Sequence, residues 1–200
     1  VYVVWIGRRS GRGGKRHALT LRESRHMHPQ APDTSLRSAV AELEAHVGRA
    51  GWEQPTRLFA LVASDRIIAD EPDLAAELAL APGTLTSVEQ AGFDAAAPLD
   101  DLLAGIAWPD SVDGVAIALE RIILPPAAEL ELAELDEAEL ADVAAEHPGR
   151  VDVRMVVAVT RDGTHDTVLR LRNAPDDLIR GRSEEQLVPQ LVDALFATLE

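Results

Sequence analysis

The sequence has no cysteine and, among its 200 residues, only one lysine and one tyrosine. The lack of cysteine excludes disulfide bonds, thiolate nucleophiles and cysteine-ligated zinc. Lys15 and Tyr2 both precede Met27, so the chain after Met27 offers no Schiff-base lysine, no phosphate-loop lysine and no catalytic tyrosine. No apolar run approaches the roughly 20 residues that cross a bilayer. Several common catalytic chemistries and a membrane anchor are therefore not expected.

Charge is distributed unevenly along the chain. Residues 1–26 hold seven basic residues and one acidic residue, a net charge of +6, whereas residues 27–200 hold 12 basic and 33 acidic residues, a net charge of −21. An acidic body of this size repels nucleic acids and anionic membranes. We therefore expect neither of them as a partner, and we expect a protein of the cytoplasm.

The basic segment 1–26 is unlike the rest of the chain. Its apolar residues come before its positive ones, contrary to a secretory signal, and Gly14-Lys15 is followed by Arg16, contrary to a phosphate loop. We interpret 1–26 as lying upstream of the true start at Met27; the alternative is a basic arm for nucleic acid. We predict a disordered basic segment over 1–32 and a single α+β domain over 33–200.

The longest β-prone apolar run, Gly114 to Leu124, predicts the central strand. Alternate side chains of this run are apolar on both faces, so the strand must be covered on both sides or lie between paired neighbours. Trp108-Pro109 predicts a rigid turn that leads into it.

Periodicity and turn residues predict the other elements. Helices are expected over 35–50, over 65–80 with a kink at Pro72, over 99–104, over 129–146 and at the C-terminus, where the helix is either kinked at Pro189 or begins there. Strands are expected over 57–63, 84–89, 153–160 and 165–172, and 173–182 is expected to be a polar connection.

The register of the last hairpin can be predicted. A two-residue turn at Asp162-Gly163 would place apolar side chains opposite arginines. A three-residue turn with Gly163 in the left-handed region instead places Met155 opposite Leu169 and forms one apolar face. We therefore predict the second register, with Val153 opposite Leu171 and Val157 opposite Thr167.

These elements predict an α+β fold with a mainly antiparallel sheet of about five strands and helices covering one face. If 65–80 and 99–104 are insertions, the element order reduces to αβββαββα. This order resembles the small acidic secretion chaperones and YbjN-like proteins, which dimerise and bind partner proteins. The likeness is one of element order alone and says little about function.

Histidines and carboxylates form no catalytic or metal-binding pattern. His165 and Asp166 are adjacent on a predicted strand and must face opposite ways. His46 is expected at the edge of the apolar stripe of its helix. Asp100-Asp101 and Asp176-Asp177 are expected in caps or turns, and the eight carboxylates of 129–146 lack the spacing of a calcium loop. We predict no catalytic residues, no metal and no cofactor.

Several motifs resemble an uncharacterised family of actinobacterial proteins. They are Gly51-Trp52, Gln54-Pro55, Arg57-Leu58-Phe59-Ala60-Leu61, Ile106-Ala107-Trp108-Pro109, Val112, Gly114, Leu124-Pro125-Pro126, the hairpin and Leu187-Val188-Pro189. The likeness covers about 33–200, leaves 1–26 unmatched and implies an actinobacterial, cytoplasmic protein without implying a reaction.

Two hypotheses for function remain. The first is a non-enzymatic protein-binding or adaptor module, with a protein partner or a second copy; Trp52, Trp108 and Pro109 are candidate partner-binding residues or, alternatively, anchors of the core. The second is a small hydrolase or ligand-binding protein that uses carboxylates and histidine. A deep pocket holding His147 or His165 with two carboxylates would favour the second.

Overall fold

The structure is a computed structural model that describes residues 34–91, 98–125, 128, 137–181 and 187–200. Two of the expectations lie outside these residues. They are the disordered basic segment with a start at Met27 and the first part of the acidic helix, over 129–136.

Twelve elements are described within these ranges. In chain order they are α1 (Thr34–Gly48), β1 (Arg57–Ala63), α2 (Ser64–Asp70), α3 (Pro72–Glu77), β2 (Leu85–Glu89), α4 (Leu99–Ala104), β3 (Gly114–Ile123), α6 (Glu137–Glu146), β4 (Val151–Thr160), β5 (His165–Leu171), β6 (Ala174–Arg180) and α7 (Pro189–Ala197).

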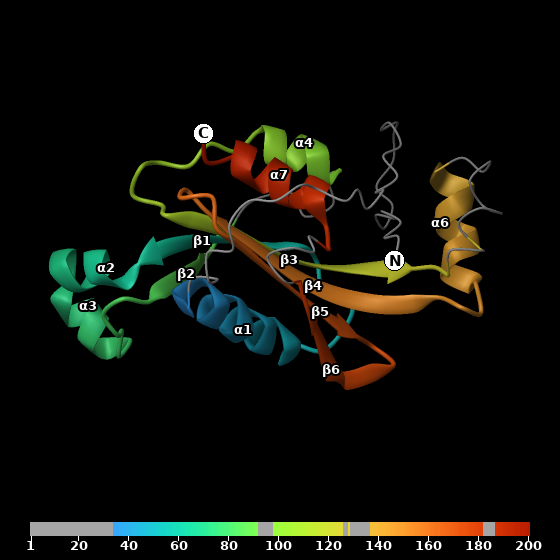
Figure 1. Cartoon of the computed structure of the whole chain (residues 1–200), viewed down its shortest axis with the longest axis horizontal. Helices are drawn as coiled ribbons and strands as arrows, with labels where there is room; N and C mark the ends of the chain where they lie inside the picture. Colours follow the sequence, from blue (N-terminus) through green and yellow to red (C-terminus); the bar gives the residue numbers. More distant parts are fainter. Residues whose placement is uncertain (1–33, 92–97, 126–127, 129–136, 182–186) are drawn as a thin grey trace, which may run out of the picture.

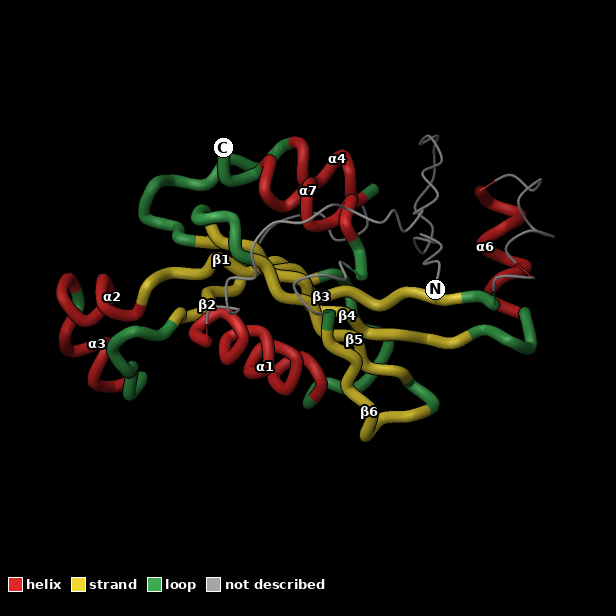
Figure 2. The backbone as a smooth tube through the Cα atoms, viewed as in Figure 1, coloured by secondary structure: helices red, strands yellow, loops and turns green. Residues whose placement is uncertain are grey.

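The strands form one antiparallel sheet in the order β2-β1-β3-β4-β5-β6 (Figure 2). β3 pairs with β1 on one side and with β4 on the other, as predicted for the central strand. The α+β fold with an antiparallel sheet is confirmed. The sheet has six described strands rather than five.

Helices cover both faces of the sheet, so the prediction of one covered face is wrong. α1 lies against one face, and α4 and α7 lie against the other (Figure 1). The reason is the alternation within β3, which is apolar on both sides. Val115, Ile117 and Leu119 belong to the core under α4 and α7, while Ala116 and Ala118 belong to the core under α1.

The two cores differ in composition. The core under α4 and α7 is built from branched and long apolar side chains, each of which gains about 1.5–3 kcal/mol when fully buried. The face under α1 also carries arginine–carboxylate pairs in a partly buried setting. Arg170 binds the buried Glu44 through two hydrogen bonds, and the buried Arg154 binds Glu120 at 2.9 Å.

The predicted register of the hairpin is confirmed. Met155 lies opposite Leu169 and Val153 lies opposite Leu171 across β4 and β5, and Gly163 has φ = 89°. Only glycine adopts this left-handed conformation without steric cost. One left-handed residue therefore places the apolar side chains of both strands on the same face.

The prediction of a polar connection over 173–182 is wrong, because β6 occupies most of it. Pro175, Asp176 and Asp177 disfavour a central strand. An edge strand tolerates them, and β6 has a neighbouring strand on one side only within the described part of the chain. β6 pairs with β5 through a register shift at Arg170/Leu171.

Two predictions about proline have clear outcomes. The helix expected over 65–80 is two helices, α2 and α3, which are separated at Glu71 because Pro72 lacks the N–H that would continue the first. The C-terminal helix begins at Pro189, one of the two alternatives. In the part of the chain that the structure describes, no helix is both long and apolar enough to cross a membrane.

Candidate functional site

Trp108 packs against the core under α4 and α7. Its side chain is partly buried, and its indole N–H donates a hydrogen bond to Oγ1 of Thr198 at 3.1 Å. The next residue, Pro109, is exposed. The ring of Trp108 therefore joins the turn before β3 to the end of the chain after α7.

Arg161 holds this turn from the other side. Its guanidinium donates to the backbone carbonyls of Val112 at 2.8 Å and of Trp108 and Pro109 at 3.1 Å each, and also to the carbonyl of Leu199. One arginine thus connects the Trp108-Pro109 turn with the C-terminal end, and the turn is fixed by contacts within the chain.

Trp52 is half-buried between α1 and β1 and lies against two arginines. The guanidinium carbon of Arg154 is 4.5 Å from the ring centroid, and that of Arg172 is 5.6 Å away. Arg154 also donates to the carbonyl of Gly51. Cation–π contacts of this kind stabilise a partly desolvated arginine, so Trp52 contributes to holding the loop before β1.

His165 and Asp166 face opposite sides of the sheet, as predicted. The ring of His165 meets Phe196 of α7 edge-on, with centroids 6.5 Å apart, whereas Asp166 binds Arg180 at 2.8 Å on the side of α1. Burial lowers the pKa of His165. Burial raises the pKa of Asp166 even though Arg180 acts in the opposite direction. The two side chains are not a catalytic pair.

The other polar candidates lie apart from one another. His147 accepts a hydrogen bond from the backbone N–H of Gly149 at 3.0 Å. Asp100 and Asp101 occupy the first turn of α4, and Asp176 and Asp177 are exposed on β6. Within the ranges that the structure describes, no three His, Asp or Glu side chains come together as metal ligands.

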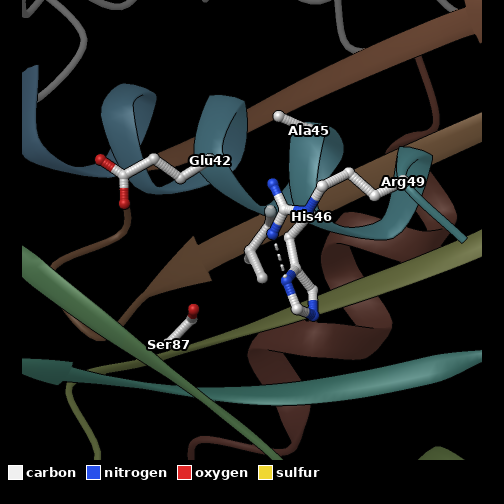
Figure 3. Close-up of a pocket in the computed structure, with 6 residues that line it drawn as sticks. Glu42, Ala45, His46, Arg49 and Ser87 are labelled. Atoms are coloured by element: carbon white, nitrogen blue, oxygen red, sulfur yellow. Dashed lines mark hydrogen bonds between the residues drawn. The ribbon is translucent and has the colours of Figure 1, made fainter. Parts of the chain in front are cut away.

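An open cavity lies between α1 and the edge strand β2. It has a volume of about 390 Å³ and is lined by Glu42, Leu43, Ala45, His46, Arg49 and Ser87; we call it the α1–β2 groove (Figure 3). Four of its six lining residues belong to α1, Arg49 directly follows that helix, and Ser87 belongs to β2.

His46 lies between two guanidinium groups in this groove. Nη2 of Arg49 is 2.8 Å from Nδ1 of the ring, and Nη2 of Arg57 is 3.1 Å from Nε2. Arginine only donates, and a neutral imidazole accepts at one ring nitrogen while the other carries its proton. In one of the two contacts, an arginine N–H therefore points at the N–H of the ring, and that contact is not a hydrogen bond. At this point the groove has more hydrogen-bond donors than acceptors.

The carboxylates near His46 do not compensate Arg49. Glu89 binds Arg57 through both of its oxygens, at 2.6 and 2.5 Å. The carboxylate of Glu42 extends away from the His46 ring (Figure 3). Among the described residues, no carboxylate pairs with Arg49. Its charge is therefore available to an acceptor from outside the chain.

The backbone of β2 faces outward beside the groove. The N–H of Gln90 donates to Leu58 and the N–H of Ser64 donates to Thr84, which fixes the hydrogen-bonded positions of the β1–β2 pair. These positions alternate along an antiparallel pair. Thr86 and Val88 therefore also bond to β1. The backbone groups of Leu85, Ser87 and Glu89 face away from β1.

Sequence reasoning did not identify the groove. The position of His46 at the margin of the α1 stripe was expected, but its contact with Arg57 depends on how α1 crosses β1, which no local pattern specifies. The signal is the spacing of His46, in the last turn of α1, and Arg49, which directly follows the helix; three residues apart, their side chains lie on one surface.

Comparisons with curated proteins and with solved structures find no match for this chain. A family model, described as PPA1309-like protein, matches residues 36–200. This range is close to the 33–200 over which the motifs of the sequence predicted a family resemblance. The chain therefore belongs to the family of PPA1309-like proteins.

Proposed function

We propose that this chain is a non-enzymatic protein-binding module that receives an extended segment of a partner protein along β2, an edge strand of the sheet that the described residues form. The observation that carries the proposal is the row of outward backbone groups at Leu85, Ser87 and Glu89 beside the α1–β2 groove. A strand added to a sheet edge gains main-chain hydrogen bonds from such groups and specificity from pockets next to them. A cytoplasmic location is part of the proposal.

An added strand would also meet an exposed apolar side chain on β2. Val88 of β2 is 45% exposed, and Leu74 of α3 and Leu78, which follows α3, are 44% and 53% exposed. All three belong to the stretch that leads into β2 and through it. Leu178 and Ile179 of β6 are 37% and 42% exposed, so apolar exposure alone does not choose between the two edges.

The hydrolase alternative gains less support. The α1–β2 groove is lined by His46 rather than by His147 or His165. The ring of His165 packs against Phe196 of α7, and the adjacent Asp166 points to the opposite face of the sheet, while His147 bonds to the backbone of its own turn. In our proposal Trp52, Trp108 and Pro109 position the fold rather than the partner.

The proposal is tested with proline at an outward position of β2. In Ser87→Pro the lost N–H makes no bond to β1, so the fold is retained while an added strand loses a donor and meets the pyrrolidine ring. Ser87→Thr is the matched control, because it keeps the N–H. We expect a partner purified with the full chain from its native host to be retained by wild type and Ser87→Thr and to be lost with Ser87→Pro.

Circular dichroism and thermal unfolding confirm that each variant is folded. Hydrogen exchange on the purified complex should show protection at the amides of Ser87 and Glu89. If Ser87→Pro holds the partner as tightly as wild type does, or if these amides exchange as fast in the complex as in the free chain, the proposal is wrong. Trp108→Ala should lower the melting temperature and leave capture by the folded fraction intact.

A further inference from the structure

We propose that the partner segment presents a carboxylate side chain opposite Ser87, and that Arg49 and His46 bind this carboxylate in the α1–β2 groove. The inference rests on the proposed function, since it concerns the side chain that an added strand would place there. It specifies the chemistry of the partner: an extended segment with an acidic residue at one defined position.

The direction of the side chain follows from the pleat of the sheet. Residues directly opposite each other on paired strands point to the same face. Ser87 lines the groove on the side of α1, so the partner residue opposite Ser87 also points toward α1. The partner residues before and after it point to the other face, where Val88 is 45% exposed. An apolar partner residue fits opposite Val88.

The chemistry of the side chain follows from the excess of donors. His46 is contacted by Arg49 at 2.8 Å and by Arg57 at 3.1 Å, and it can accept a hydrogen bond from only one of them. Glu89 already occupies Arg57. A carboxylate accepts hydrogen bonds and supplies none, so it can bind Arg49 and the ring N–H of His46 together. A basic side chain would add donors to a place that already has too many.

A second copy of this chain is a poorer occupant. If two β2 strands paired about Ser87, Thr86 of one copy would lie opposite Val88 of the other, and Leu85 would lie opposite Glu89. Each of these contacts sets a polar or charged side chain against an apolar one. Ser87 of the second copy would place a hydroxyl, and not an anion, in the groove.

The test uses a five-residue probe built on this register. Acetyl-Thr-Val-Glu-Thr-Leu-amide places Glu opposite Ser87, Val opposite Val88 and Leu opposite Leu85 when it pairs antiparallel to β2. The control peptide has Gln in place of Glu, which keeps size and shape. Binding to the full chain is followed by the NMR shifts of the backbone amides of Leu85, Ser87 and Glu89.

We expect the Glu peptide to bind about tenfold more tightly than the Gln peptide at low salt, the effect of one charge-assisted contact. Arg49→Gln should remove this difference. Glu42→Gln should increase the affinity for the Glu peptide by a few fold, because it removes a like charge from the groove. Glu42 of α1 and Arg49, which directly follows that helix, are thus expected to act in opposite directions, as the opposite charges of the two side chains in the groove require.

The outcomes separate the two proposals. Equal shifts with both peptides would overturn the acidic preference and leave strand addition at β2 standing. Shifts with neither peptide at millimolar concentration would overturn the inference, whereas the Ser87→Pro experiment decides the proposed function independently. Sedimentation of the free chain as a dimer that Ser87→Pro converts to monomers would also overturn it, because the second copy would then occupy the edge.

Discussion

β2 and β6 form the two edges of the same sheet, and each is held by an arginine–carboxylate pair, but the two pairs have different environments. On the β2 edge, Arg57 binds Glu89, whose side chain is 45% exposed. On the β6 edge, Arg180 binds Asp166 at 2.8 Å, and the carboxylate is only 8% exposed. The hydrogen bond from Arg57 lowers the pKa of Glu89, whereas burial raises the pKa of Asp166.

The backbone of β6 is also less suited than that of β2 to pairing with a further strand. The N–H of Gly181 donates to Thr167, so the outward positions of β6 include Leu178 and Arg180. Pro175 removes a donor, and Asp176 and Asp177 add charge, which are the means by which edge strands avoid pairing with other chains. β2 has no proline and carries one charge, at its last residue. We infer that β6 closes the sheet and that β2 leaves it available for a partner.

The largest expected contrast between the edges is in stability. Arg180→Met leaves the buried Asp166 without its partner and should cost about 3 kcal/mol of unfolding free energy at pH 8. Arg57→Met breaks an exposed pair and should cost about 1 kcal/mol or less. Urea unfolding measures both. The double variant Arg180→Met with Asp166→Leu should recover most of the loss, because no unpaired charge remains; equal costs for the two single variants would contradict the comparison.

A smaller contrast separates inward from outward positions within β2. Thr86→Pro removes an N–H that faces β1 and should cost about 2 kcal/mol. Ser87→Pro removes an outward N–H and should change stability much less. Thermal unfolding of the two variants, with Thr86→Ala and Ser87→Ala as controls, measures the difference. A larger loss for Ser87→Pro than for Thr86→Pro would mean that the assignment of outward groups is wrong.

The parts of the fold that the sequence predicts are those set by alternation and by single turns. β3 could be predicted because Val115 to Leu119 are apolar on both faces, and the β4–β5 register because Gly163 allows one turn geometry that keeps Met155 and Leu169 on one face. The separation of His165 from Asp166 follows from the same alternation. In each case the information lies within a few residues.

β6 and the α1–β2 groove depend on contacts that local patterns do not specify. Pro175, Asp176 and Asp177 are typical of a loop, and they form a strand because β5 offers an open edge and Arg180 reaches the buried Asp166. The groove requires α1 to place His46 beside Arg57 of β1. Such contacts are set by how helices pack on the sheet, which composition and periodicity leave undetermined.

The two edge pairs should respond to pH with opposite signs. The pKa of Glu89 is lowered in the folded chain, so its contribution is present above the ordinary pKa of about 4.3 and is lost as the pH falls through the lowered value. The pKa of Asp166 is raised, so its contribution is present below the ordinary pKa of about 3.9 and is lost as the pH rises through the raised value.

Isosteric variants isolate these two contributions. As the pH is lowered from 8, wild type should gain stability relative to Asp166→Asn, and at the acid end it should lose stability relative to Glu89→Gln. Urea unfolding of the three proteins between pH 3 and pH 8 checks both slopes. If the stability of wild type relative to Asp166→Asn and its stability relative to Glu89→Gln change in the same direction with pH, the two carboxylates do not have the different environments described above.

Removing the charges of Asp176 and Asp177 should have the smallest effect on unfolding. It also tests whether these charges keep β6 from pairing with another chain. Asp176 and Asp177 are exposed and form no ion pair among the described residues, so replacing both by valine should change the unfolding free energy by less than about 0.5 kcal/mol. Association should nevertheless increase, because Leu178 and Ile179 already expose apolar surface on both faces of this edge. Sedimentation velocity at increasing protein concentration measures it, with Asp73→Val on α3 as the control for loss of surface charge. If the β6 variant stays as monodisperse as the control does, its charges do not protect the edge, and the difference between β2 and β6 must lie in the backbone alone.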